Sequence, residues 1–131
     1  MSDHAGLDLV VSTNYGWTMH CPPGTSKRTL RNWPIQAAGS EIMHLFCILA
    51  ERRGLPVVAS IHDAFMAEGA VADIEDVSHE LDRAMGDASA LVLGGYRLPT
   101  DPGAGPILPG QRFYDKHGEA MWNRINQLID G

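Results

Sequence analysis

Two short runs of β-forming residues, separated by one polar pair, most constrain how this chain of 131 residues can fold. The first run includes Val57 and Ile61, and the second includes Phe65. A two-residue connection can join only antiparallel neighbours, because parallel strands need a long crossover. The pair between the runs, His62-Asp63, is therefore either a polar turn, in which Asp is favoured, or a functional site carried on a hairpin.

Two amphipathic helices are predicted, one before the hairpin and one after it. The first begins at Pro34, which suits a first helical turn, and ends at Arg53, before Gly54. The second runs from about Ala72 to Val92. Apolar residues recur at steps of three and four in both segments, which predicts one buried face on each helix. The predicted core positions are Ile35, Ala38, Ile42, Leu45, Phe46 and Leu49 in the first helix, and Ile74, Val77, Leu81, Met85, Ala88 and Leu91 in the second.

The remaining segments complete a mixed pattern of strands and helices. Strands are predicted at Leu7–Ser12, Gly16–His20 and Leu98–Asp101, and a last helix at Glu119–Ile129. The order ββαββαβα predicts an α+β fold, an antiparallel sheet with helices packed on one face. The length is that of one domain, so residues 1–131 are expected to form a single unit.

Composition limits the functions that this chain can have. Apolar residues make up 44% of the sequence, as in folded globular proteins, and the net charge is −6. Free-standing nucleic-acid binders are usually basic, so any binding of nucleic acid must use a local patch. Two cysteines, Cys21 and Cys47, cannot build a disulfide framework and suit a reducing cytoplasm. The most apolar run, Ile42 to Ala50, is too short to span a bilayer, so we expect a soluble cytoplasmic chain with no membrane partner.

Two motifs, in this order and at this spacing, carry a resemblance. "RNWPIQAAGSEI", from Arg31 to Ile42, is followed by "SIHDAFMAEG", from Ser60 to Gly69. Together they resemble the C-terminal part of the palm of family A DNA polymerases, in particular the phage- and plasmid-type branch, where the third motif commonly reads His-Asp-Ala. The similarity continues through "ALVLGGYRLPTD" and "FYDKHGEAMWNRI", so it covers nearly the whole chain.

The resemblance implies a role for five residues. Asp63 is expected to be one of two aspartates that hold Mg²⁺ for two-metal nucleotidyl transfer onto a primer 3′-hydroxyl. His62 is expected to contact the primer end. Gln36 is expected to donate to minor-groove acceptors there, which nearly all base pairs share. Arg28 and Asn32 are expected to contact the template strand, and their spacing of four from each other and from Gln36 can place all three on one helix face.

The sequence also departs from the family. Ala64 follows the aspartate where the bacterial repair enzymes have Glu, and neither the first aspartate motif nor the fingers helix is found. Primer–template DNA and a deoxynucleoside triphosphate are therefore expected as partners only together with a polymerase part that supplies both. We expect the isolated chain to be inactive. Two alternatives stay open: an inactive polymerase-derived domain kept as an interaction or structural module and, for the residues around Asn32, a helix cap beside solvated basic side chains.

Overall fold

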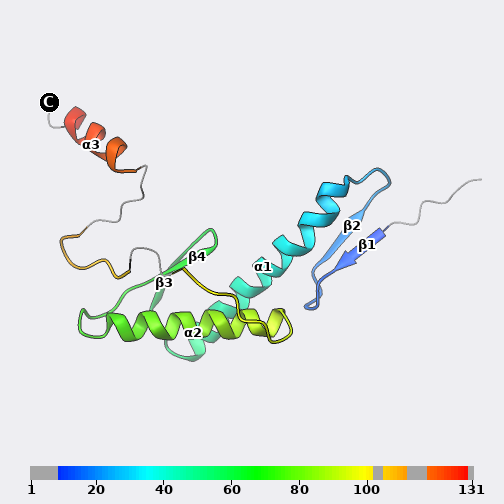
Figure 1. Cartoon of the computed structure of the whole chain (residues 1–131), viewed down its shortest axis with the longest axis horizontal. Coiled ribbons are helices and arrows are strands. Elements are labelled where there is room, and N and C mark those ends of the chain that lie inside the picture. Colours follow the sequence, from blue (N-terminus) through cyan, green and yellow to red (C-terminus); the bar gives the residue numbers. More distant parts are fainter. Residues whose placement is uncertain (1–8, 102–104, 112–117, 130–131) are drawn as a thin grey trace, which may run out of the picture.

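The computed structural model of this chain describes residues 9–101, 105–111 and 118–129. Figure 1 shows two β-hairpins arranged along a long helix, with a second helix packed across its C-terminal half. The elements are β1 (Leu9–Ser12), β2 (Thr18–Cys21), α1 (Lys27–Arg52), β3 (Val57–Ile61), β4 (Ala64–Ala67), α2 (Ile74–Val92) and α3 (Gly118–Ile129). The predicted α+β class with antiparallel pairing is confirmed. None of the helices in the described ranges is long and apolar enough to cross a membrane.

The described strands form two separate two-stranded sheets, β1–β2 and β3–β4. Residues 7 and 8 of the first predicted strand lie outside the described residues. The predicted strand Leu98–Asp101 is wrong, because this segment lies along α2 and bonds to its side chains instead. The backbone N–H of Leu98 donates to Ser89 Oγ at 3.0 Å, and the Thr100 hydroxyl donates to the Asp82 carboxylate.

Helix α1 begins at Lys27, about two helical turns before the predicted start at Pro34. Ser26 caps it: its Oγ accepts a hydrogen bond from the backbone N–H of Thr29 at 3.1 Å. Ser is among the best residues at this position because it satisfies an N–H that has no partner within the helix. Pro34 therefore lies inside the helix, as does Trp33 before it. The missing proline N–H costs one helix hydrogen bond, and a capped first turn is already formed ahead of it.

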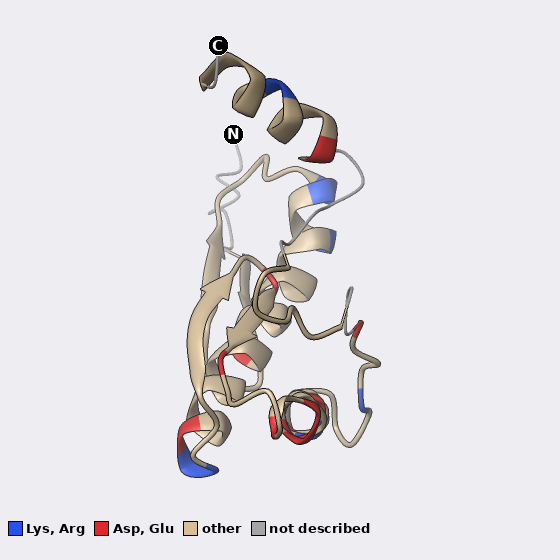
Figure 2. Ribbon diagram, turned by 90° about the vertical axis from the view of Figure 1, so that its left-hand side faces the viewer, with Lys and Arg blue, Asp and Glu red and all other residues tan. Residues whose placement is uncertain are grey.

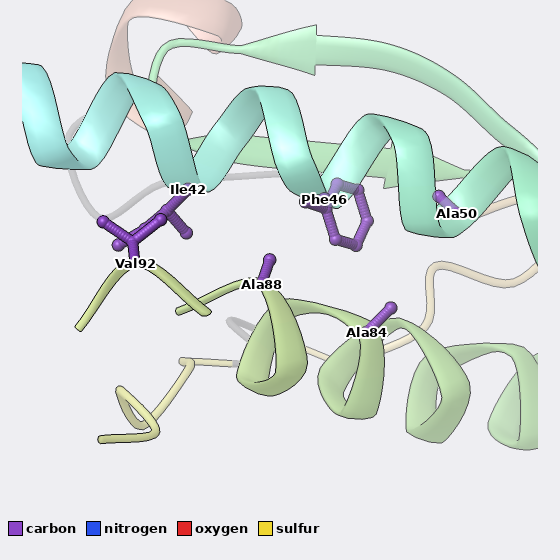
Figure 3. Close-up of a cluster of buried hydrophobic side chains, with 6 residues drawn as sticks. All are labelled: Ile42, Phe46, Ala50, Ala84, Ala88 and Val92. Carbon is purple, nitrogen blue, oxygen red and sulfur yellow. The ribbon is translucent and has the colours of Figure 1, made fainter. Parts of the chain in front are cut away.

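The core lies where α1 crosses α2 (Figure 3). Phe46 on α1 is 1% exposed and faces α2, where Ala84 and Ala88 are both fully buried. Alanines at these positions let the two helices approach closely, since no long side chain separates them. The ring of Phe46 also packs on Phe65 of β4, with ring centroids 4.2 Å apart. One aromatic side chain thus joins α1, α2 and one face of the β3–β4 hairpin.

The β1–β2 hairpin packs on another side of α1, at Glu41 and His44 near the middle of the helix. The Thr13 hydroxyl donates to the carboxylate of Glu41, which is 4% exposed. One helical turn further, the Trp17 ring lies against His44 with centroids 5.7 Å apart. Glu41 and His44 are thus held against the hairpin by polar and aromatic contacts rather than by an aliphatic core.

The predicted core faces are only partly correct. Ile42 and Phe46 are buried, but Ile35 is 70% exposed, because α2 covers only the C-terminal half of α1. On α2, Leu91 is 55% exposed, and its neighbour Val92 is buried instead. The steps of three and four identify a face, but they do not say how far along a helix that face is covered.

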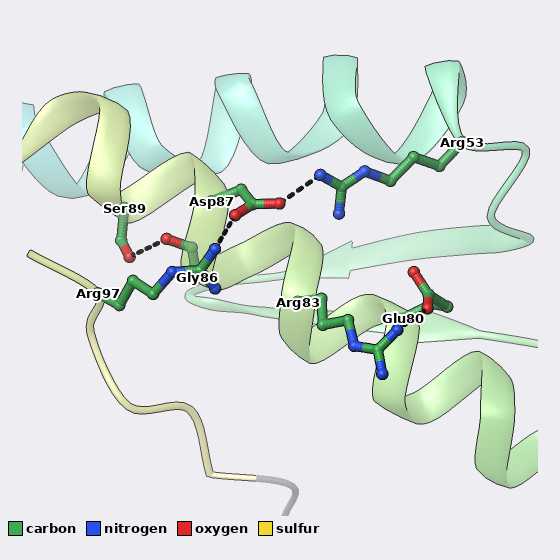
Figure 4. Close-up of polar contacts among 7 residues, drawn as sticks. All are labelled: Arg53, Glu80, Arg83, Gly86, Asp87, Ser89 and Arg97. Carbon is green, nitrogen blue, oxygen red and sulfur yellow. Dashed lines mark hydrogen bonds and ion pairs between the residues drawn. The ribbon is translucent and has the colours of Figure 1, made fainter. Parts of the chain in front are cut away.

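An ion cluster fixes the C-terminal end of α1 against α2 (Figure 4). The Asp87 carboxylate accepts hydrogen bonds from Arg53, just after α1, and from Arg97, beyond α2. The Arg53 hydrogen bond, more than any other contact, lowers the pKa of Asp87 below its ordinary value of 3.8. The cluster is half-buried, with 29% of the Asp87 side chain exposed, so solvent screens it only in part.

Phe46→Ala is expected to lower the free energy of unfolding by about 3–5 kcal/mol, because it removes a buried ring and leaves a cavity between three elements. Phe46→Leu should cost less, since it keeps most of the apolar volume. Urea denaturation followed by far-UV circular dichroism measures both. Ile48→Ala on the exposed opposite side of α1 is the control and should change stability by less than about 1 kcal/mol.

Asp87→Asn is expected to cost about 1 kcal/mol at neutral pH. Because the folded state lowers the pKa of Asp87, its stabilisation is complete above the ordinary value and is lost as the pH falls through the lower folded value. Denaturation curves from pH 7 to pH 2 should therefore show parent and variant converging only in acid. Glu80→Gln, which removes the exposed partner of Arg83, should show less than about 0.5 kcal/mol throughout. A constant Asp87→Asn difference down to pH 2 would contradict the assignment.

Candidate functional site

The His62-Asp63 pair forms the whole connection between β3 and β4. Ile61 and Ala64 are the last paired residues of the two strands, so the pair is a two-residue turn, as predicted. Both side chains stand in solvent, 90% exposed for His62 and 87% for Asp63. His62 Nδ1 lies 3.3 Å from Asp63 Oδ1, so the imidazole and the carboxylate are close neighbours at the turn.

The backbone at His62 is held in a conformation that side chains disfavour. Its φ is +55°, and among the described residues it is the only one other than glycine with a positive φ. A positive φ at the first turn position fits a type II′ hairpin turn, where glycine is preferred because it has no Cβ to clash. Folding alone would therefore favour Gly at this position. A strained residue held at a turn is grounds for a functional hypothesis.

The core holds the turn in place. Phe65, two residues after Asp63, packs on Phe46, and its strand partner is Ser60. The half-buried Phe65 thus ties the strand that follows Asp63 to the core. Rigid support of this kind is what a metal ligand or a primer contact requires.

The other predicted site residues lie along the N-terminal half of α1. Arg28, Asn32 and Gln36 are all exposed. Because the helix is continuous from Lys27 to Arg52, their spacing of four places them along one side, as predicted. Asn32 lies inside the helix and Ser26 is the cap, so the alternative that Asn32 caps the helix is wrong.

The charge at the start of α1 is opposite to what helix stability favours. Lys27, Arg28 and Arg31 lie within its first turns, and no acidic residue lies in the first turn. The helix macrodipole favours acidic side chains at this end and disfavours basic ones. Figure 2 shows these blue segments at one end of α1, away from the red segments of α2, which packs on the C-terminal half of α1. An anionic ligand would explain the basic cluster, since backbone N–H groups and cations would then act together.

The structure keeps the two groups of predicted residues on separate elements. Across the described ranges, neither a hydrogen bond nor an ion pair joins Arg28, Asn32 or Gln36 to the His62-Asp63 turn. Nor does any group of three or more His, Cys, Asp or Glu side chains in those ranges form a site that could hold a metal ion. Mg²⁺ usually binds one or two carboxylates together with water and phosphate oxygens. Asp63 alone supplies one carboxylate, so a Mg²⁺ ion bound there would need its remaining ligands from water, a substrate or another polypeptide.

Comparisons of the chain with protein-family models, with curated proteins and with solved structures found no match. The geometry of the turn and of α1 therefore carries the functional argument, together with the sequence motifs.

His62→Gly is expected to raise the free energy of unfolding by about 0.5–1 kcal/mol, because glycine adopts a positive φ without steric cost. Asp63→Gly, one residue later in the same turn, should give no such gain, because the φ of Asp63 is not positive. Chemical denaturation of the three proteins measures the difference. Equal effects of the two glycine substitutions would show that His62 is not strained.

Proposed function

We propose that this chain is the C-terminal catalytic palm portion of a family A DNA polymerase and works together with a part that supplies the first aspartate motif and the fingers. The observation that carries this proposal is the His62-Asp63 turn: a carboxylate is displayed to solvent on an anchored hairpin, beside a histidine with a positive φ. A polar turn without a function requires neither the contact of Phe65 with Phe46 nor a residue other than glycine at a positive φ.

Each residue then has a physical task in primer extension. Asp63 holds one metal from a fixed position, and His62 contacts the primer end beside it. Mg²⁺, when bound, lowers the pKa of the primer 3′-hydroxyl and neutralises charge on the transferred phosphate. Arg28 and Asn32 bind the template strand, while the Gln36 amide tests the minor groove of the terminal base pair. The two groups hold different parts of one substrate, so they need not touch each other.

A protein partner is supported by the surface that the chain exposes. Val58, Ile61 and Met66 on the β3–β4 hairpin are each about half exposed. Apolar surface of this kind favours association with a further polypeptide. It is equally expected of an inactive interaction module, so only an activity measurement separates the two functions.

The deciding experiment supplies a fragment with the first aspartate motif and fingers, mixed with this chain or fused ahead of Met1. The 131-residue chain alone should not extend a primer with Mg²⁺ and four nucleotides, because one carboxylate cannot hold two metals. The combined protein should extend it. Asp63→Asn should then lower kcat on the order of 10²–10³-fold, because it keeps the shape of the side chain and removes a charge needed chiefly in the transition state.

Asp76→Asn on the exposed side of α2 is the matched control and should leave kcat unchanged. Extension by the combined Asp63→Asn protein at the parental rate would overturn the metal assignment. A combined protein that binds its fragment but never extends a primer would favour the inactive module.

A further inference from the structure

Strand β1 forms an edge that no other described strand covers. In the part of the chain that the structure describes, its one neighbour is β2. In Figure 1, β2 lies between β1 and α1, so β1 is the outer strand of the hairpin. A two-stranded sheet is at best marginally stable by itself, and a third strand is the usual remedy. The edge of β1 is therefore a place where a further strand would stabilise the fold.

The ladder with β2 determines which backbone groups of β1 point outward. Directly after β1, the N–H of Thr13 donates to the carbonyl of Trp17 at 2.9 Å. Bonded and non-bonded pairs alternate along an antiparallel ladder, so Val11 also bonds toward β2. Val10 and Ser12, on either side of Val11, then direct their N–H and C=O groups away from β2. Donors and acceptors in this alternation match the backbone of another extended strand.

The edge of β1 lacks the features by which natural edge strands avoid such pairing. Those features are charged side chains, prolines and bulges. A bulge interrupts β3 after Val57, charged residues flank β4, and two prolines follow β2. From Leu9 to Ser26 the sequence has no Asp, Glu, Lys or Arg, and the first proline comes after β2. Leu9 and Val10 are also about half exposed, so β1 offers apolar surface together with its open backbone.

We propose that β1 pairs with β1 of a second copy of this chain, antiparallel and centred on Val11, to form a four-stranded sheet. Antiparallel pairing of a strand with itself is two-fold symmetric, as most dimers are. Val10 of each copy then lies opposite Ser12 of the other, and each such pair exchanges two hydrogen bonds. The second copy supplies a strand of equal length, and no like charges meet between the two strands. The pairing uses neither the His62-Asp63 turn nor the start of α1, so it goes beyond the proposed function and does not depend on it.

Sedimentation velocity of the 131-residue chain over a range of concentrations tests this pairing. The parent should dimerise with a dissociation constant of about 10–100 μM, because a single pair of short strands makes a small interface. Val10→Pro removes an N–H that points outward, at an edge position where a strand tolerates proline. It should weaken dimerisation about tenfold or more, since each copy loses one hydrogen bond to the other, and leave the melting temperature near that of the parent.

His20→Pro is the matched control on the other edge of the same hairpin. His20 lies opposite Val10 in a non-bonded pair, so its N–H points away from β1. This variant should dimerise like the parent.

A disulfide trap tests the register without proline. In a chain carrying Cys47→Ser, which removes the exposed thiol, Val11→Cys should form a covalent dimer under mild oxidation. The two copies of residue 11 form a non-bonded pair, with Cα atoms about 4.5 Å apart, within reach of a disulfide. Val10→Cys should form this dimer much more slowly, because its two copies lie diagonally, about 7–8 Å apart.

A parent chain that stays monomeric at about 1 mM overturns the inference. Equal weakening of the dimer by Val10→Pro and His20→Pro overturns it too, because the edge of β1 would then have no special part. Crosslinking of Val10→Cys as fast as Val11→Cys would exclude the register centred on Val11.

Discussion

The burial of one aromatic ring organises most of this molecule. Phe46 is the largest apolar side chain that is almost fully enclosed, and its ring contacts the Phe65 ring of β4. Ala84 and Ala88 on α2 leave the room that the ring occupies. Since a buried phenylalanine contributes several kcal/mol to a protein whose net stability is of the same order, the positions of α2 and of the β3–β4 hairpin both depend on it. The hairpin turn is placed through the same contact.

A second constraint is the length of α1, which is greater than that of the elements packed against it. Helix α1 has 26 residues, about 39 Å, whereas α2 has 19 and crosses only its C-terminal half. The β1–β2 hairpin holds α1 from another side, through Thr13 and Glu41 near the middle of the helix. One face of the first turns is thereby left open to solvent. The basic and amide side chains on that face are available to a ligand because no other described element covers them.

The sequence predicts the local elements better than their assembly. The hairpin at His62-Asp63 is predictable because two β-forming runs are joined by only two residues. The start of α1 is not, since Pro34 matches a first helical turn as well as the Ser26 cap does. The exposure of Ile35 is also beyond the sequence, because periodicity identifies a face and says nothing about the length of the helix that covers it. The strain at His62 likewise depends on which turn type the two strands impose.

The net charge of −6 is compatible with the proposed binding of DNA, because charges act locally in salt solution. At physiological ionic strength, interactions between exposed charges fade over about 8 Å. After Lys27, the next acidic residue on α1 is Glu41, which lies about 21 Å further along the axis. The acidic residues of α2 lie beside the C-terminal half of α1, away from its first turns (Figure 2). Lys27, Arg28 and Arg31 would therefore attract a phosphate placed at the start of α1, although the chain as a whole is acidic.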